Sequence, residues 1–175
     1  MKVKGFTMIE LLVVVALIMI LASVGLGAYT ISTTRSYDTQ RKSDLNQISK
    51  ALESFNNDIG RYPLSDANGA ILCYQKEAGV VTNPTCPGAK LTIRLEGVVN
   101  SYISIPVDPD PSNTYMYESD GNTYSLYARL HNSEDKDLLR DENGVVIADP
   151  YGVSCGVDVC NYKITEVGLA KTNEE

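Results

Sequence analysis

Histidine is almost absent from this sequence: His131 is the only one in 175 residues. Cys-x-x-Cys pairs are missing too, which removes the usual spacing of a zinc site. No glycine-rich phosphate loop occurs, and no nucleophile-elbow pattern surrounds a serine. Carboxylates are plentiful but scattered, so no catalytic set emerges and the sequence does not predict an enzyme.

Basic side chains are also scarce, with 15 lysines and arginines against 22 aspartates and glutamates. The formal net charge of −7 gives a surface that repels nucleic acid rather than attracting it. We therefore expect no nucleic-acid partner for this chain.

Charge is nearly missing between Phe6 and Tyr29, where Glu10 is the only charged residue in 24. At 1.5 Å per residue, a helix of this length crosses a hydrocarbon core of about 30 Å. Lys2 and Lys4 precede the segment, and no further lysine or arginine follows until position 35. The sequence thus predicts a transmembrane helix here, with a cytoplasmic N-terminus.

Glu10 is the costly residue of this segment. A carboxylate near a helix centre in lipid costs roughly 2.5–3.5 kcal/mol, and less toward a helix end, so it needs a partner. A secretory signal peptide would be cleaved after its apolar region. The natural cleavage point here lies before that region, between Gly5 and Phe6.

The start of the chain resembles the type IV pilin and pseudopilin family. The family signature is a short basic leader ending in glycine, then a phenylalanine with a glutamate four residues later, in front of an unbroken apolar helix. The matching residues are Gly5-Phe6-Thr7-Met8-Ile9-Glu10-Leu11. The resemblance implies that a prepilin peptidase cleaves between Gly5 and Phe6, removes residues 1–5 and methylates the new N-terminus at Phe6.

Cleavage would leave an α-amino group on Phe6, which is mostly protonated at neutral pH. In a packed helix bundle of low dielectric, opposite charges attract strongly when they pair and are unfavourable when they do not. We therefore predict that Glu10 of one subunit pairs with the Phe6 amine of its neighbour and sets the axial register of a filament. The alternative is an ordinary signal anchor with a stray glutamate near the membrane interface.

Further along, an apolar stripe at steps of three and four residues predicts that the helix continues to about Asp58. Residues 30–44 in between are almost wholly polar. Gly60 and Pro63 predict the helix end. The stripe consists of Leu45, Ile48, Leu52, Phe55 and Ile59.

Small residues late in the apolar segment, at Ser23, Gly25 and Gly27, predict a softened stretch of helix. Close helix packing through the glycines is an alternative interpretation. Residues 40–63 and 102–109 loosely resemble the major pseudopilin group.

Beyond Pro63 the sequence predicts one small β-rich core. Strands at 114–117 and 123–130 flank the hairpin signal Asp120-Gly121, and a third strand is expected at 162–165. The second strand should face the helix with Tyr124, Leu126, Ala128 and Leu130.

The region before this hairpin is expected to be irregular. Residues 61–94 should form a long loop with one short strand at 71–74, and residues 96–102 a helical turn. The predicted fold is α+β and pilin-like: a long N-terminal helix packed on a small antiparallel β-sheet head. Its expected parts are a leader (1–5), a transmembrane and assembly helix (6–29), a helix continuation on the head (30–60) and a disulfide-bonded head (61–175).

Four cysteines lie in the part expected to be exported, and they predict two disulfides. Three pairings are open, and sequence proximity favours Cys73 with Cys86 and Cys155 with Cys160. In the chain-entropy description each adds about 2–3 kcal/mol. A zinc site is the rival interpretation, which the missing Cys-x-x-Cys spacing disfavours.

An acidic cluster follows the predicted strand 123–130. Oxygen-rich loops hold Ca²⁺, and major pseudopilins carry a calcium site in the corresponding loop. The resemblance therefore makes Glu134, Asp135 and Asp137 calcium candidates. The EF-hand spacing is absent, and a solvated acidic loop is the simpler interpretation. No other cofactor is expected.

The resemblance implies a structural filament subunit of a type IV pilus or of a type II secretion pseudopilus. Its expected partners are copies of itself, the prepilin peptidase, the inner-membrane assembly platform and, before assembly, the membrane. The expected location is the inner membrane for the single-pass precursor, then a cell-surface pilus or a periplasmic pseudopilus. The alternatives are a membrane-anchored or fibre-tip minor pilin with an adhesive head, and an enzyme on an anchor.

Overall fold

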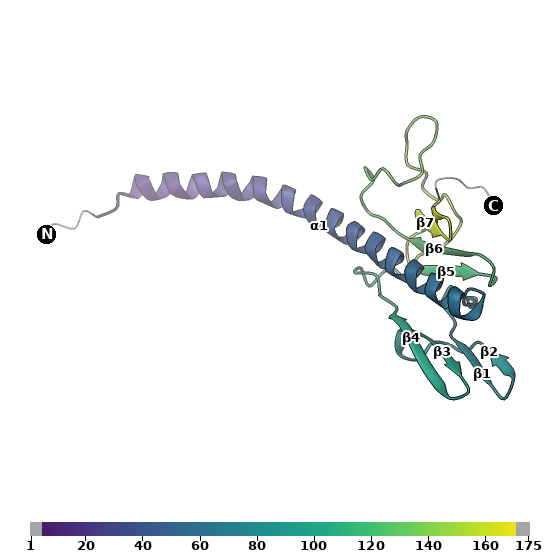
Figure 1. Cartoon of the computed structure of the whole chain (residues 1–175). Coiled ribbons are helices and arrows are strands. Elements are labelled where there is room, and N and C mark those ends of the chain that lie inside the picture. The colour runs from purple at the N-terminus through teal and green to yellow at the C-terminus, as the bar shows by residue number, and fades with distance from the viewer. Residues whose placement is uncertain (1–4, 171–175) are drawn as a thin grey trace. The chain divides into compact units, whose positions relative to one another are not determined.

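The computed structural model describes residues 5–170 of the chain, apart from the side chains of residues 24–28. Two units are each compact in themselves, Met1–Tyr37 and Asp38–Glu175. Helix α1 (Met8–Ile59) contributes to both units (Figure 1). The second unit also contains strands β1 to β8 and is called the head below.

Helix α1 begins directly after Thr7 and ends where Gly60 follows Ile59. Gly60 has a φ of +82°, the left-handed conformation that glycine adopts without strain. Its amide donates to the Asn56 carbonyl at 2.7 Å, which closes the last helical turn. Gly60 therefore ends the helix, as the sequence predicted.

The helix expected from Phe6 to about Asp58 is confirmed, because its observed bounds differ by at most two residues. The softened stretch expected at Ser23–Gly27 falls mostly on residues whose side chains lie outside the described part. Among the residues whose placement is described, no helical stretch is both long and apolar enough to cross a membrane.

The first sheet of the head has the strand order β2-β1-β3-β4. Strands β1 and β3 are parallel, and the other neighbours are antiparallel. A short 3₁₀ helix, Pro87–Ala89, precedes β3. The strands are β1 (Tyr74–Glu77), β2 (Val80–Thr82), β3 (Lys90–Leu95) and β4 (Val98–Ser104).

The second sheet is antiparallel throughout, with the order β5-β6-β7-β8. The hairpin expected around Asp120-Gly121 is confirmed as the connection of β5 and β6, and β7 is the expected third strand. The strands are β5 (Met116–Ser119), β6 (Tyr124–Ala128), β7 (Tyr162–Thr165) and β8 (Gly168–Leu169).

The first sheet corrects two expectations, because residues 61–94 are not a long loop and residues 96–102 are not a helical turn. They contain β1, β2, most of β3 and most of β4 instead. Two tight hairpins, whose turns each have two residues of positive φ, explain the difference. The turn residues are Ala78 with Gly79 and Glu96 with Gly97.

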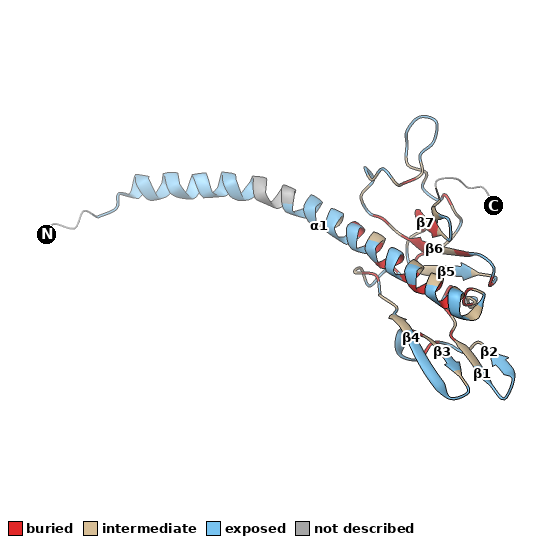
Figure 2. Ribbon diagram, viewed as in Figure 1, coloured by how far each residue is buried: buried red, intermediate tan, exposed pale blue. Residues whose placement is uncertain are grey.

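The core lies where the head part of α1 contacts both sheets, and Figure 2 shows the buried side of that part in red. The predicted helix stripe is buried: Leu45, Ile48, Leu52 and Phe55 are at most 1 % exposed, and Ile59 packs against the same cluster. The predicted face of β6 is buried as well, with Tyr124, Leu126 and Ala128, and Leu130, which lies two residues beyond the end of the strand, is buried too. Burying one aliphatic side chain contributes about 1.5–3 kcal/mol to stability. The packing of this stripe therefore holds the head part of α1 against the two sheets.

Two disulfides join Cys73 to Cys86 and Cys155 to Cys160, the pairing that sequence proximity favoured. The first links the residue before β1 to the residue before the 3₁₀ helix. The second packs against Tyr127, which points to the face of β6 opposite the core. Each disulfide therefore supports a stretch of the head that has little apolar content of its own.

Candidate functional site

The first turn of α1 contains a capping box. The Glu10 amide donates to Thr7 Oγ1 at 3.3 Å, while the Thr7 amide and hydroxyl donate to Glu10 Oε2 at 2.9 and 2.7 Å. Reciprocal bonds of this kind satisfy amide groups that have no partner within a first helical turn. Glu10 therefore has a polar partner within its own chain.

Sequence reasoning missed this partner of Glu10, although the Thr-x-x-Glu spacing is itself the signal of a capping box. In the described chain Phe6 is still joined to Gly5, so its nitrogen is an amide and not an amine. The pairing of Glu10 with the Phe6 amine of a neighbour stays a prediction.

The expected cleavage site is open to a peptidase. Phe6 is 79 % exposed, and nothing lies within 4 Å of the position that a Cβ on Gly5 would take. The capping box begins one residue after Phe6. The bond between Gly5 and Phe6 therefore lies just outside the helix, where an enzyme can bind it in an extended conformation.

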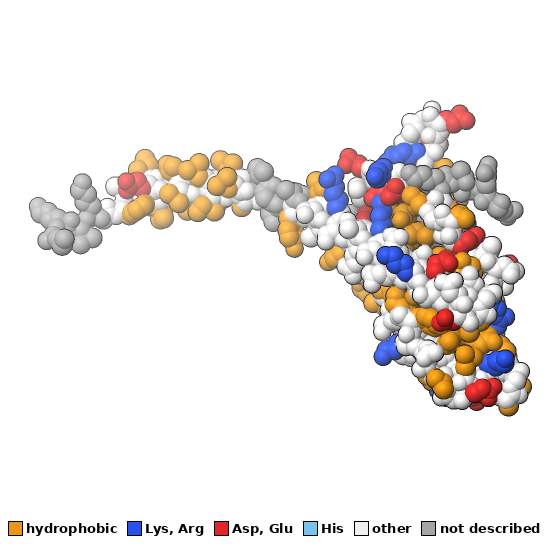
Figure 3. Space-filling view, viewed as in Figure 1, with side chains coloured by type: hydrophobic (Ala, Val, Ile, Leu, Met, Phe, Trp, Pro, Cys, Tyr) orange, Lys and Arg blue, Asp and Glu red, His pale blue; other side chains and the backbone are white. Residues whose placement is uncertain are grey.

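Apolar side chains cover the part of α1 between the capping box and Leu21 (Figure 3). Every large apolar residue between Met8 and Leu21 is at least 42 % exposed. A helix that is apolar on all sides is normally surrounded by lipid or by other helices. A shallow groove runs along it, lined by Met8, Leu11, Leu12, Val15, Ala16 and Met19.

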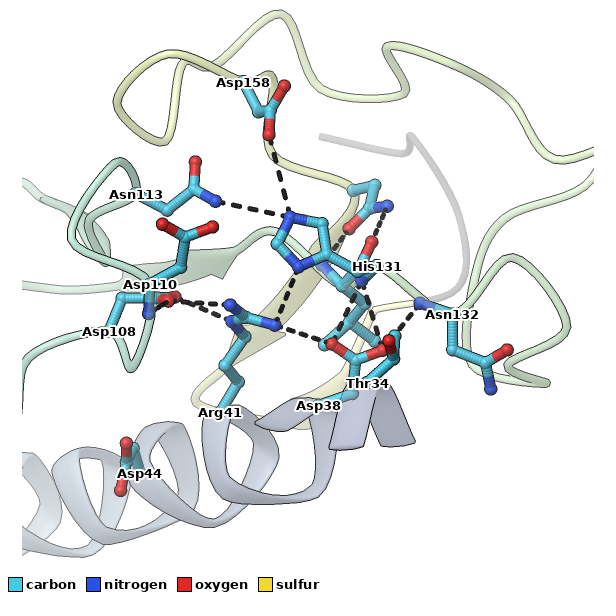
Figure 4. A network of polar contacts seen from close by, with 12 residues as sticks. Thr34, Asp38, Arg41, Asp44, Asp108, Asp110, Asn113, His131, Asn132 and Asp158 are labelled. Atoms are coloured by element: carbon cyan, nitrogen blue, oxygen red, sulfur yellow. Dashed lines mark hydrogen bonds and ion pairs between the residues drawn. The ribbon is translucent and has the colours of Figure 1, made fainter. Parts of the chain in front are cut away.

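A second polar site lies inside the head, around the fully buried Arg41 (Figure 4). Arg41 Nε and Nη2 donate to the two carboxylate oxygens of Asp108, each at 2.8 Å. Arg41 Nη1 donates to Asp38 Oδ1, also at 2.8 Å. A bidentate arginine–carboxylate pair is among the strongest side-chain contacts, so it ties α1 firmly to the segment that follows β4.

The two carboxylates hold main-chain amides as well. Asp38 accepts from the amides of His131 and Asn132, the latter at 2.7 Å, and Asp108 accepts from the amide of Asp110 at 2.8 Å. The cluster around Arg41 therefore joins α1 to two loops, one after β4 and one after β6.

Two opposing effects determine the pKa of Arg41. Burial disfavours a charged guanidinium, but the hydrogen bonds and negative charges of Asp108 and Asp38 outweigh it and raise the pKa of Arg41. Arg41 therefore stays charged. Sequence reasoning treated residues 30–44 as a plain polar stretch. The missed signal was the spacing of Asp38 and Arg41, which puts opposite charges on one helix face.

The calcium candidates lie in the loop after β6, where Lys42 reaches two of them. Lys42 Nζ contacts Asp135 Oδ1 at 2.6 Å and Asp137 Oδ2 at 2.8 Å. Nowhere in the described part of the chain do three or more His, Cys, Asp or Glu side chains form a group that could hold a metal ion. Calcium binding at Glu134, Asp135 and Asp137 stays a prediction.

These features define a class of protein in which a capped glutamate begins an exposed apolar helix and a disulfide-bonded α+β head follows. Residues 1–26 match the family model described as the Prokaryotic N-terminal methylation motif, the signature of type IV pilins and pseudopilins. This N-terminal motif supports a pilin-like protein of the kind that prepilin peptidase processes, and it implies a structural protein. No curated protein and no solved structure matches the chain significantly.

Proposed function

We propose that this chain is a structural subunit of a type IV pilus or of a secretion pseudopilus, and that it polymerises through α1 after prepilin peptidase has removed residues 1–5. The methylation motif at residues 1–26 carries the proposal. The exposed apolar surface between Met8 and Leu21 supports it, because identical helices packed side by side would cover that surface.

Before assembly, the same segment would hold the precursor in the inner membrane, with the N-terminus in the cytoplasm and the head outside. Residues 6–29 contain a single charged residue, Glu10. The capping box fits this state, because Thr7 gives the carboxylate hydrogen-bond donors close to lipid. The assembly platform would then take up the processed subunit from the membrane.

In the filament, Glu10 would accept the Phe6 amine of a neighbouring subunit. Three substitutions separate this charge pair from the capping box. Glu10→Gln keeps the box, because glutamine also serves at this position, but it removes the charge. Glu10→Ala removes both, and Thr7→Ala removes the cap while keeping the acid.

We expect Glu10→Gln and Glu10→Ala to be inserted and cleaved but to assemble poorly, and Thr7→Ala to assemble nearly normally. Electron microscopy of sheared surface material measures the fibres, and mass spectrometry detects an N-methylated Phe6. Gly5→Leu should block processing and leave the leader attached. Normal fibres from Glu10→Gln would contradict the charge pair, and a surface form that keeps residues 1–5 would contradict the proposal as a whole.

A second candidate function is a membrane-anchored or fibre-tip minor pilin with an adhesive head. The head is compatible with this function, because its core and the Arg41 cluster are complete within a single chain. Immunogold labelling of the head distinguishes the two functions. A body subunit is labelled along the whole fibre, and a tip subunit only at its end.

A further inference from the structure

We propose that His131 is a pH-operated contact that switches between Arg41 on α1 and Asp158 in the disulfide loop. His131 follows β6, and its ring lies between these two charged residues (Figure 4). It is the only histidine of the chain, and histidine is the side chain whose charge ordinarily changes between pH 5 and 8.

Arg41 fixes the protonation state of the ring in the present arrangement. Arginine offers N–H donors, has no acceptor and stays charged, and its Nη1 lies 3.2 Å from His131 Nδ1. Nδ1 therefore accepts, which leaves the ring neutral with its hydrogen on Nε2. A proton on Nδ1 would set two donors and two positive charges against each other.

The other ring nitrogen faces the opposite side. Nε2 lies 3.7 Å from Asp158 Oδ2 and 3.4 Å from the Asn113 side-chain nitrogen. Because Nε2 bears the ring hydrogen, the Asn113 amide must turn its oxygen toward it, and this buried oxygen has no other hydrogen-bond partner among the described residues. Asp158 belongs to the loop that the Cys155–Cys160 disulfide closes. The present distance to Asp158 is longer than a hydrogen bond, so this contact can strengthen when the ring becomes positive.

Charged groups surround the ring on every element that packs against it, and four of the five are acids. The hydrogen bond from the Ser112 amide keeps the pKa of Asp110 below its usual value, and the positive charge of Arg41 adds to this effect. An imidazolium formed once Nδ1 has left Arg41 would therefore have carboxylates on several sides. The five groups are Asp38 and Arg41 on α1, Asp108 and Asp110 after β4, and Asp158 in the disulfide loop.

The ring can change partner while the main chain stays in place. Its side chain is 33 % exposed, so protons reach it from water, and the His131 amide is held by the Asp38 carboxylate at 3.0 Å. When Nδ1 takes up a proton from water, it loses the hydrogen bond from Arg41, and the imidazolium pairs with Asp158. Arg41 keeps both of its carboxylates, so α1 loses one contact and the disulfide loop gains one.

Nuclear magnetic resonance on the full-length protein in detergent micelles tests the switch, because a chain with one histidine gives one set of ring signals. We expect hydrogen exchange of the α1 amides at residues 38–42 to become about fivefold faster as the ring is protonated. That factor corresponds to about 1 kcal/mol, the typical net contribution of one hydrogen bond. His131→Asn keeps an acceptor for Arg41 but does not titrate, so it should abolish this pH dependence.

Asp158→Asn should require a lower pH for protonation of the ring, because it removes the anion that receives the imidazolium. Asp120→Asn is the matched control, since Asp120 has the same charge but lies before β6, at the opposite end of that strand from His131. Exchange at residues 38–42 that does not follow the titration of the ring would overturn the proposal. An equal effect of Asp158→Asn and Asp120→Asn would overturn it as well.

Discussion

The apolar side chains of α1 are exposed in one part of the helix and buried in the other. Between Met8 and Leu21 every large apolar residue is exposed, and the one acid bonds within its own turn. Between Asp38 and Ile59 the apolar stripe is buried, and Arg41 finds two carboxylates inside the head. The apolar core of the head is buried within a single chain. The exposed apolar surface of the first unit, in contrast, is of the kind that lipid or other helices normally cover.

The head part of α1 therefore contributes to folding, and its N-terminal part would contribute to the proposed assembly. Substitutions in the head should change its stability and leave processing at Gly5 intact. Substitutions of Glu10 should change assembly and leave the head folded. The predictions below test whether the two parts are independent, beginning with the largest expected effect.

Arg41→Ala should destabilise the head most, by about 3–5 kcal/mol, because it leaves Asp38 and Asp108 buried without their cation. Urea unfolding of the full-length protein in detergent micelles, followed by circular dichroism, measures the loss. Cleavage of the leader by the peptidase should continue at its normal rate.

Arg94→Ala is the control for this experiment. Arg94 Nη1 lies 3.9 Å from Glu77 Oε1, and both side chains are about half exposed. Such a pair contributes less than about 1 kcal/mol to the stability of the fold. Equal losses for the two arginine variants would contradict the role given to the buried cluster.

Removing the disulfides should have the next largest effect, and the two should differ. The separations are 13 residues for Cys73–Cys86 and 5 residues for Cys155–Cys160. In the chain-entropy description this corresponds to about 3 and about 2 kcal/mol. Double alanine variants of each pair, compared by thermal unfolding, measure the difference. A greater loss from the shorter loop would show that packing against Tyr127 outweighs the loop entropy.

Local signals in the sequence predicted the parts of the fold that depend on neighbours along the chain. The stripe from Leu45 to Ile59, the glycine that ends α1 and the Asp120-Gly121 hairpin are all readable within a few residues. The disulfide pairing also followed from proximity. The motif at residues 5–11 is equally local, so its residue types and their spacing are enough to locate the expected processing site.

The pairing of β1 with β3 and the Arg41 cluster depend instead on residues that are farther apart in sequence. Arg41 and Asp108 are 67 positions apart, and nothing near either residue announces the other. The parallel pairing of β1 with β3 is likewise non-local. Periodicity within a segment does not encode such contacts, so the buried cation was missed. Residues 61–94 were wrongly assigned to a loop for a local reason, because the hairpin turns at Ala78-Gly79 and Glu96-Gly97 were not recognised.

Alkaline pH should lower the stability of the head. A substitution in the capping box should not change this loss. Burial raises the pKa of Tyr124, Tyr127 and Tyr151 to about 12. The unfolded chain therefore loses these protons first, near pH 10. Stability is fully present below about pH 10 and falls as the pH rises toward 12, by about 1 kcal/mol per buried tyrosine at pH 11.

Unfolding by urea at several alkaline pH values, with tyrosinate absorbance recorded in parallel, measures this loss. Tyr124→Phe should remove one part of the pH dependence, because phenylalanine does not titrate. Thr7→Ala is the control outside the head and should leave the alkaline midpoint unchanged. A stability that stays constant up to pH 12 would mean that the tyrosines are not held neutral by burial.

Lys42→Gln should have a small effect, about 1 kcal/mol, because its contacts with Asp135 and Asp137 are partly open to solvent. The loss should shrink as salt is added, since salt screens exposed charges, whereas the loss from Arg41→Ala should change little. The variant also removes the ammonium that neutralises two of the calcium candidates. Added Ca²⁺ should therefore raise the melting temperature of Lys42→Gln more than that of the unmodified protein. An equal rise in both would mean that calcium binds away from Lys42, and no rise in either would exclude the calcium site predicted at Glu134, Asp135 and Asp137.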